Sequence, residues 1–277
     1  MNQFQTNRAP ASPGGPPDCL IFDVDGVLID AGESFPEAVR MTVEREWRAG
    51  GYECDAPGYS REHNSVLKRH GSFNDDYDIA WTLLNISAHH AERLGNKLSD
   101  AMPSPEELGR IIGGCIGSSV DWTRAEFGER FGRRRIRDSC AGAYFGEGES
   151  EGTCSLERAC LSADWRDLPL PAYVYTGRDE REWRMARRTL SWGDFPDERV
   201  VHSGTGMLKP SPDGIDFICG RFGHARPLYF GDTESDRMAQ LSSGKGWFVA
   251  VGEILTSGEL WFGDVSTALS KLTGWMR

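Results

Sequence analysis

The sequence predicts an α/β protein in which a parallel β-sheet is covered by helices on both faces and is interrupted by a helical insertion. Two observations predict the sheet: an apolar run at 19–22, and a regular alternation of short apolar runs with helical patterns from Pro171 onward. A third predicts the insertion, because the residues between them have helical periodicity and no dominant strand-like alternation. Such alternation makes a parallel sheet, since right-handed crossovers place the helices outside it.

The first strand ends in two acids. The run CLIFDVDGVLID at 19–30 is apolar up to Asp23, and Asp25 and Gly26 follow. Because side chains alternate along an extended chain, the two acids share a face, and the glycine allows a sharp turn. Neighbouring carboxylates repel unless a divalent cation neutralises them or one holds a proton, as in a nucleophile with an acid/base partner. For the acid pair alone, a strand running into an Asx turn is the alternative.

The insertion extends from about Glu33 to Ala163. Apolar residues recur there at intervals of three and four in the runs FPEAVRMTVEREW, YDIAWTLLNISAHHAERL, PEELGRIIGG and SVDWTRAEFGERF. A basic run, RRRIR at 133–137, lies in this helical sequence. A solvated helix face explains the basic run better than a patch for nucleic acid or substrate does.

The remaining strands and helices follow the insertion. The strand-like runs are AYVYT, RVVHS, PLYFG and GWFVAVG, and the helical runs are REWRMARRTL, DGIDFICGRF, ESDRMAQL and DVSTALSKL. Open parallel sheets bind ligands at the carboxyl ends of their strands. Asp23, Thr176 and Asp232 fall at such ends, so the insertion is expected to lie over them as a lid. The expected domains are a disordered leader at 1–17, a sheet domain at 18–31 and 165–277, and a helical insertion at 32–164.

Four short motifs occur in a fixed order along the sheet segments. The acids at 23 and 25 are followed by Thr176 in YVYTGR, Lys209 in HSGTGMLKPSP, and Asp232 with Asp236 in PLYFGDTESD. In this order they resemble the four motifs of the haloacid dehalogenase superfamily, and the match runs from residue 18 to about the C-terminus. The resemblance implies a Rossmann-like core with an α-helical cap, within the group of phosphoglycolate phosphatase-like and beta-phosphoglucomutase-like proteins. The insertion is tens of residues longer than a minimal four-helix cap.

The resemblance also implies roles in phosphoryl transfer, which needs a nucleophile, charge neutralisation and a proton for the leaving group. Asp23 would attack phosphorus to give an aspartyl-phosphate, and Asp25 would protonate the leaving group and then activate water. Thr176 and the amide of Gly177 would bind a phosphoryl oxygen, while Lys209 would balance the acids. Dehalogenases that resemble this fold lack an acid at the second position, so Asp25 indicates a phosphate ester rather than a carbon–halogen bond.

The implied cofactor is Mg²⁺, which prefers octahedral oxygen ligation and keeps several waters. Asp23, Asp232 and the backbone carbonyl of Asp25 match the ligands of the family. Asp236 is expected to orient a metal-bound water or the motif lysine, and an ordinary acid in the first turn of a helix is its alternative. Arg178 is open between a substrate contact and an arginine that caps a helix or pairs with a neighbouring acid.

Substrate selection is expected to come from the insertion. The segment LKRHGSFNDDYDIAW at 67–81 concentrates polar side chains around a glycine between two helical patterns. We take Lys68, Arg69 and Asn74 as candidate substrate contacts. The alternative is a solvated turn in which Asn74 or Asp75 caps the next helix.

Composition bounds the class of protein. The 277 residues suffice for a core with an inserted cap, and the formal net charge of −11 argues against a protein that coats nucleic acid. Seven cysteines without a CxxC pair fit reduced thiols in a cytoplasm better than disulfides or a zinc knuckle. No apolar stretch approaches the length of a membrane span. The N-terminus lacks the basic start and following apolar stretch that would indicate a secretory signal peptide.

The sequence therefore predicts a Mg²⁺-dependent phosphatase that hydrolyses a small phosphorylated metabolite. A phosphomutase shares every core motif and is the closest alternative, since it differs only in returning the phosphoryl group to its substrate. A non-catalytic regulator that binds a metabolite is a further alternative, although no nucleophile or metal ligand is missing. The partners expected are the metabolite, no nucleic acid and no membrane, and both a monomer and a homodimer remain open.

Overall fold

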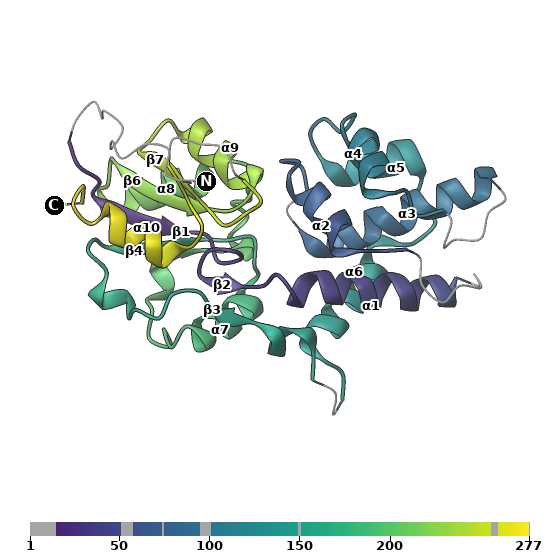
Figure 1. Ribbon diagram of the computed structural model, residues 1–277, viewed down its shortest axis with the longest axis horizontal. Helices are drawn as coiled ribbons and strands as arrows, with labels where there is room; N and C mark the ends of the chain where they lie inside the picture. Colours follow the sequence, from purple (N-terminus) through teal and green to yellow (C-terminus); the bar gives the residue numbers. More distant parts are fainter. Residues whose placement is uncertain are drawn as a thin grey trace, which may run out of the picture. The chain divides into compact units, whose positions relative to one another are not determined.

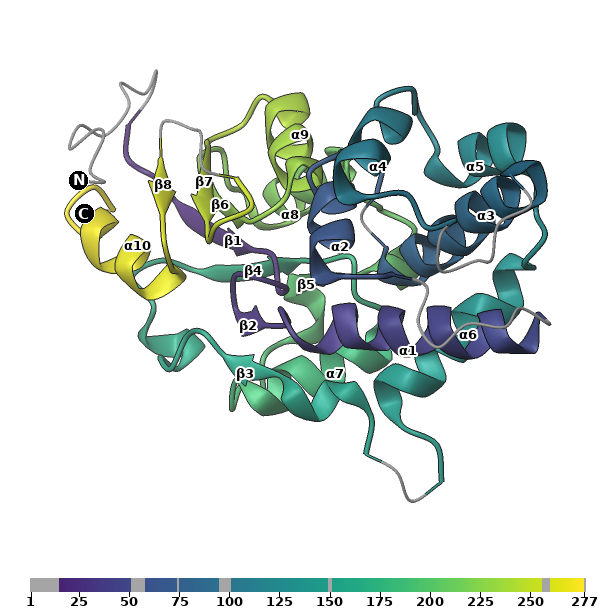
Figure 2. The same cartoon turned by 45° about the vertical axis from the view of Figure 1, so that its right-hand side comes forward.

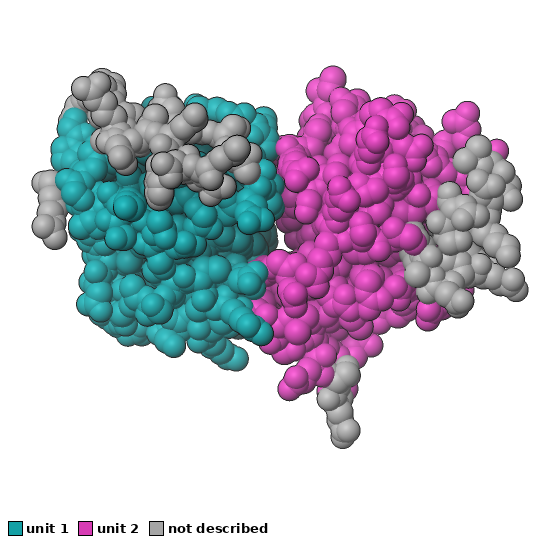
Figure 3. All heavy atoms as spheres, viewed as in Figure 1, with its two compact units in different colours: residues 1–30, 158–277 teal, residues 31–157 magenta. Residues whose placement is uncertain are grey.

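A computed structural model describes residues 15–50, 58–73, 75–94, 101–148, 151–255 and 260–276. The chain divides into two compact units (Figure 3). Unit 1 comprises residues 1–30 and 158–277, and unit 2 comprises residues 31–157. The leader expected at 1–17 lies almost wholly outside the described residues, since the description begins at Gly15.

Unit 1 is built on a parallel sheet. Within the described residues its six strands lie in the order β5-β4-β1-β6-β7-β8, and every neighbouring pair is parallel. The strands are β1 (Cys19–Phe22), β4 (Ala172–Tyr175), β5 (Val200–Val201), β6 (Pro227–Gly231), β7 (Trp247–Val251) and β8 (Trp261–Phe262).

The central strands are apolar because both faces of the sheet are covered. Ile21 of β1 pairs in register with Tyr173 of β4 on one side and Tyr229 of β6 on the other. These residues belong to one buried cluster, which also contains Ile215 and Ile218 from the helix that follows β5. A strand buried on both faces reads as a continuous apolar run, as residues 19–22 do.

Helices cover both faces of this sheet. The helices are α7 (Glu180–Thr189), α8 (Asp213–Phe222), α9 (Glu234–Ser243) and α10 (Val265–Leu272), with short 3₁₀ turns at Trp165–Asp167, Asp197–Arg199 and Ser203–Thr205. The helices α8 and α9 pack together on one face and α7 lies on the other, while α10 packs against β7 and β8 (Figures 1 and 2). The predicted α/β class with a parallel sheet is confirmed.

An antiparallel ribbon marks the place where the chain leaves unit 1 and returns to it. Strand β2 (Ile29–Asp30) pairs with β3 (Arg158–Ala159), with Ile29 opposite Ala159 and Asp30 opposite Arg158. The amide of Cys160 also donates a hydrogen bond to the carbonyl of Leu28 over 2.8 Å. The two ends of the insertion therefore lie side by side.

All the regular secondary structure described in unit 2 is helical, and turns and loops join the helices. Its helices are α1 (Ser34–Ala49), α2 (Arg61–Lys68), α3 (Asp76–Leu94), α4 (Pro105–Ile112), α5 (Ser119–Phe127) and α6 (Arg133–Phe145), followed by a 3₁₀ turn at Thr153–Leu156. Helices α1, α3 and α6 pack against one another, and α2 packs against α4. The rings of Phe35 and Tyr144 stack at 4.5 Å between α1 and α6. No described helix is long and apolar enough to cross a membrane.

The basic run on α6 is largely committed to ion pairs within unit 2. Arg133 and Arg137 contact Asp78 over 2.7 and 3.0 Å, and Arg135 contacts Glu46 over 2.7 Å. These arginines therefore bind acidic side chains of their own unit.

Candidate active site

Three strand ends place the motif side chains at one edge of the sheet. Strand β1 lies between β4 and β6, so Asp23, Thr176 and Asp232, each following one of these strands, stand at neighbouring carboxyl ends. The amide of Asp23 continues the ladder by donating to the carbonyl of Phe230 over 2.8 Å. The parallel arrangement thus explains why residues more than 200 positions apart in sequence meet here.

Lys209 bridges two of the motif acids. Its Nζ lies 2.6 Å from Oδ1 of Asp23 and 2.5 Å from Oδ1 of Asp236, and all three side chains are buried. The ammonium group also lies 5.5 Å from the ring centre of Tyr175. This arrangement supports the sequence-based expectation that Lys209 balances the acids and that Asp236 orients it.

Asp236 also lies in the first turn of α9, as its alternative expects. Thr233 and Asp236 form the capping box of α9, in which the Thr233 hydroxyl donates to Oδ2 of Asp236 over 2.6 Å. The Tyr229 hydroxyl donates to Oδ1 over 2.6 Å. The same carboxylate thus caps the helix and contacts Lys209, while its role in the reaction stays a prediction.

Arg178 is fixed on the second acid of the first motif. Its Nε and Nη2 donate to Oδ1 of Asp25 over 3.0 and 2.6 Å, and Nη1 donates to the carbonyl of Glu182 over 3.3 Å. Arg178 is 2 % exposed, which is rare for an arginine. Of the two possibilities left open by the sequence, the structure shows the pairing with an acid.

Gly26 is required by the position of Asp232. Its backbone has φ +71°, and a Cβ at this position would lie 2.2 Å from Oδ2 of Asp232. Any other residue would therefore meet both backbone strain and a collision with the carboxylate. The absence of a side chain at Gly26 thus leaves room for the carboxylate of Asp232 beside the turn after β1.

The other predicted phosphate-binding residues lie at the end of β4. Thr176 is buried, and its Oγ1 accepts a hydrogen bond from the amide of Arg178 over 3.1 Å. Gly177 follows Thr176 directly and is exposed. Thr176, Gly177 and the acids of β1 thus follow neighbouring strands of the sheet.

The charges of the site do not balance. Among the described residues it gathers four carboxylates, from Asp23, Asp25, Asp232 and Asp236, against two cations, Lys209 and Arg178. The excess of two negative charges equals the charge of one divalent cation. Carboxylate oxygens of Asp23, Asp232 and Asp236 lie within 4.8 Å of one another, and this all-oxygen donor set fits Mg²⁺.

The same imbalance perturbs the titration of the buried groups. Burial and the neighbouring Asp236 raise the pKa of Asp23 to about 7, although Lys209 opposes the shift. Burial alone would lower the pKa of Lys209, but the charges of Asp23 and Asp236 outweigh it and raise the value. Burial also acts to raise the pKa of Asp236, and the charge and hydrogen bond of Lys209 reverse the direction. Perturbed buried groups of this kind cluster at functional sites.

The three candidate substrate contacts belong to unit 2. Lys68 is ion-paired with Asp76 over 2.7 Å, and Asn64 also donates to Asp76 over 3.1 Å. Asp75 caps α3 by accepting from the amide of Tyr77 over 2.9 Å, as the solvated-turn alternative expects. Asn74 lies outside the described residues.

Arg69 lines a groove between α2 and α4. The groove has a volume of about 480 Å³, and Val66, His70, Gly109 and Ile112 also line it. This geometry neither requires nor opposes a substrate role, which stays a prediction for all three residues.

Among known proteins, the chain is similar to solved structures that share its fold. No protein-family model and no curated protein sequence matches the chain. Among solved structures, phosphatase Tt82 from Thermococcus thioreducens is similar at 27 % identity with a TM-score of 0.64, over 92 % of this chain and 99 % of that one. A hydrolase from Pseudomonas syringae is similar at 16 % identity with a TM-score of 0.59, over 93 % and 98 %.

A third similar structure is a predicted phosphoglycolate phosphatase from Haemophilus somnus, at 14 % identity with a TM-score of 0.51, over 98 % of each chain. The parallel sheet and the helical insertion after its first strand give the chain a Rossmann-like core with an inserted helical unit, and acids stand at the strand ends. The ordered motifs resemble those of the haloacid dehalogenase superfamily, and the phosphatase that is 27 % identical to the chain shares the fold that this resemblance implies.

Proposed function

We propose that the protein is a Mg²⁺-dependent phosphatase that hydrolyses a small phosphate monoester. One observation carries the proposal. The buried carboxylate of Asp23 stands at the carboxyl end of the central strand, 2.6 Å from the ammonium of Lys209, in a site with two uncompensated negative charges. Such a site is ready to accept a divalent cation and a phosphoryl group, and the similar phosphatase structures support this reading.

The reaction proposed proceeds in two displacements. A carboxylate oxygen of Asp23 attacks phosphorus while the bond to the ester oxygen breaks, and the leaving oxygen takes a proton from Asp25. Asp25 then removes a proton from a water, which attacks the aspartyl-phosphate and releases inorganic phosphate. Thr176, the Gly177 amide and Lys209 bind the phosphoryl oxygens in both steps.

Mg²⁺ would be held by the carboxylates of Asp23 and Asp232 and by the backbone carbonyl of Asp25. When bound, it neutralises the negative charge of the phosphoryl group and of the acids around it. The protein itself provides the fixed oxygens, with Gly26 leaving room for Asp232 and with Asp236 holding Lys209 in place.

Unit 1 would be the catalytic core and unit 2 the cap. The cap would select the substrate through contacts to its leaving group, for which Lys68, Arg69 and Asn74 are the candidates. The six cysteines of the described residues are free thiols, which fits the proposed cytoplasmic location.

The test is a screen of phosphorylated metabolites that measures phosphate release with Mg²⁺. We expect turnover of one class of ester, none after removal of the metal by a chelator, and none for Asp23→Asn. Asp197→Asn is the matched control, because this acid is exposed and ion-paired with Arg187 on the surface of the same unit. Activity that survives in Asp23→Asn would contradict the covalent mechanism.

The same screen distinguishes a phosphomutase. A mutase would release little phosphate and would convert a sugar phosphate to its isomer when a sugar bisphosphate is supplied. Free phosphate in excess over isomer, without a bisphosphate, is the result expected for the phosphatase.

A further inference from the structure

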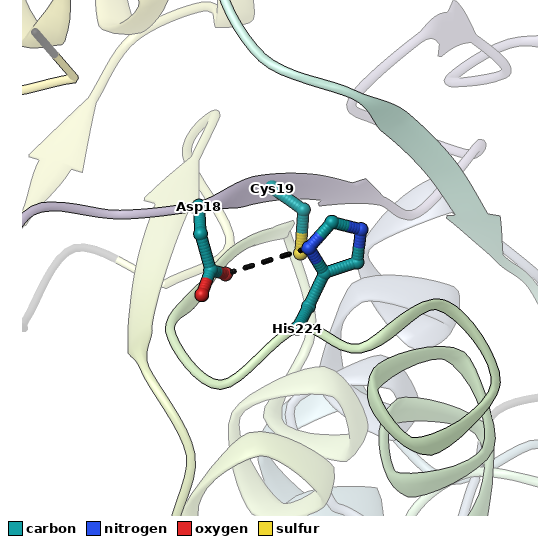
Figure 4. A group of neighbouring side chains, drawn as sticks. All are labelled: Asp18, Cys19 and His224. Atoms are coloured by element: carbon teal, nitrogen blue, oxygen red, sulfur yellow. Dashed lines mark ion pairs between the residues drawn. The ribbon is translucent and has the colours of Figure 1, made fainter.

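A second group of ligand-type side chains lies at the opposite end of β1. Asp18 precedes this strand, Cys19 is its first residue, and His224 follows the C-terminal cap of α8 (Figure 4). A carboxylate oxygen, the thiol sulfur and a ring nitrogen lie within 4.8 Å of one another. Five residue steps separate Asp18 from Asp23, so this group lies about 16 Å from the catalytic acids.

We propose that Asp18, Cys19 and His224 form a binding site for a thiophilic divalent cation such as Zn²⁺. Thiolate, imidazole and carboxylate are the ligands that Zn²⁺ uses, and three protein ligands with a water in the fourth position make a common tetrahedral site. Sulfur and nitrogen donors select Zn²⁺ or Co²⁺, whereas an all-oxygen set such as the catalytic acids selects Mg²⁺.

The group is supported by further contacts of the kind that orient metal ligands. The Tyr173 hydroxyl and Nε2 of His224 are 2.8 Å apart, which leaves Nδ1 as the nitrogen that faces Cys19 and Asp18. Asp18 accepts hydrogen bonds from the amides of Ala225 and Arg226 over 2.9 and 3.0 Å. Metal-binding histidines and carboxylates are held by partners of this type.

The backbone holds the two ligand segments in register. Cys19 pairs with Pro227 in the sheet, and the amide of Asp18 donates to the carbonyl of Arg226 over 3.1 Å. Nδ1 of His224 lies 3.8 Å from Oδ1 of Asp18, close to the separation of roughly 3.3 to 3.7 Å between ligands of a tetrahedral Zn²⁺.

A cysteine, a histidine and an aspartate also suggest a nucleophilic triad, but burial argues against one. Cys19 is 0 % exposed, so a substrate cannot reach its sulfur for a nucleophilic attack. A cation would enter past Asp18 and His224, whose side chains are 24 % and 13 % exposed. On coordination the thiol of Cys19 forms the metal–sulfur bond and its proton goes to solvent.

The guanidinium of Arg226 pairs with Oδ2 of Asp18, the oxygen other than the one next to His224. Arg226 lies 3.6 Å from Oδ2 of Asp18 and is held elsewhere by the carbonyl of Pro16, which accepts from its Nε over 2.6 Å. Oδ1 of Asp18 is the oxygen nearer to His224.

The experiment is a Co²⁺ titration of the full-length, metal-stripped protein under reducing conditions, with Mg²⁺ in excess to occupy the catalytic acids. We expect a near-ultraviolet thiolate-to-cobalt charge-transfer band that saturates at one Co²⁺ per chain and is displaced by Zn²⁺. Oxygen ligands alone cannot give this band. Its absence from the wild-type protein would overturn the proposal.

Variants assign the band to its ligands. Cys19→Ser should abolish it, and Cys219→Ser is the matched control, because this second buried thiol of the same core should leave it intact. Since Cys19 is buried, His224→Gln near the surface provides the independent test and should weaken Co²⁺ binding at least about tenfold. A band that survives in His224→Gln and disappears in Cys219→Ser would contradict the assignment. Phosphate release with Mg²⁺ should not change in His224→Gln, so this result is independent of the proposed function.

Discussion

Asp23 contributes to the way in which the stability of the metal-free protein depends on pH. Its pKa is raised from 3.8 to about 7 by burial and by the neighbouring Asp236, so the folded protein holds this proton more tightly than the unfolded chain does. The stabilisation from the bound proton is complete below pH 4 and is lost as the pH rises to 7. Above pH 7 the folded protein therefore carries the full cost of a buried carboxylate.

Asp23→Asn should accordingly stabilise the metal-free protein at pH 8 and have little effect near pH 4, where the wild-type side chain is also neutral. Each kcal/mol gained would raise the melting temperature by roughly 2–4 °C. Thermal unfolding across this pH range measures the effect, with exposed Asp197→Asn as the control. With Mg²⁺ added, the wild-type protein should become more stable than the variant, because only the wild type keeps the full set of metal ligands. A variant that is less stable than the wild type at both pH values would contradict the charge imbalance.

Arg178 is a positioning residue for Asp25. A lysine cannot reproduce its two hydrogen bonds to one carboxylate, so Arg178→Lys should lower kcat by about 10- to 100-fold for an alkyl phosphate, whose leaving group needs a well-placed acid. An aryl phosphate with a good leaving group should lose much less. Arg184→Lys is the control, because this exposed arginine lies on α7, the helix that follows Arg178. Equal losses on both esters would indicate damage to the fold.

The limits of sequence-based prediction are clearest among these residues. Asp23, Thr176 and Asp232 could be predicted, because parallel strands bring their carboxyl ends to one edge whatever the exact register. The pairing of Arg178 with Asp25 joins residues 153 positions apart and depends on side-chain directions that no local pattern encodes. His224 likewise meets Asp18 and Cys19 only because β1 and β6 pair as they do.

At the scale of elements, the start of α9 links helix stability to the site. Thr233→Ala removes the capping hydroxyl and also a hydrogen bond to Asp236. We expect a loss of about 1 kcal/mol in unfolding free energy. Because Asp236 holds Lys209, the variant should also lose activity.

Asp264→Ala at the start of α10 is the matched control for this prediction. Asp264 caps its helix through the amide of Thr267 over 2.7 Å, and its other carboxylate oxygen accepts from the hydroxyl of the same residue. Asp264→Ala should lower the unfolding free energy by a similar amount and leave kcat unchanged. Equal loss of activity in both variants would mean that the effect is only a loss of fold.

The strands show which elements a pattern can predict. β1, β4, β6 and β7 have four or five residues each, and their apolar runs identify them. β8 and the ribbon of β2 and β3 have two residues each, and β8 lay outside every expected run. The positions of these three strands depend on tertiary neighbours and on the two ends of the insertion, so no local sequence pattern predicts them.

For the whole molecule, the ribbon of β2 and β3 predicts that unit 1 can exist without unit 2. Joining Asp30 to Arg158 through a short glycine-rich linker should give a protein that unfolds cooperatively, because these residues already face each other. It should retain Mg²⁺-dependent hydrolysis of an aryl phosphate and lose discrimination among metabolites. Asp23→Asn in the shortened chain controls for contaminating activity. A shortened chain that does not fold would show that the sheet depends on the insertion. The domain boundaries at 31/32 and 164/165 stay a prediction that this experiment would refine.

The ribbon also bears on how the chain folds. Strands β1 and β4 are neighbours in the sheet but are separated by roughly 150 residues, and the entropy lost in closing a flexible loop grows with its length. If unit 2 folds first and brings its own ends together, the effective loop shrinks to roughly 20 residues, and the entropic cost of pairing the two strands falls by about 2 kcal/mol. The insertion would then act as a folded spacer that speeds the pairing of the central strands rather than delaying it.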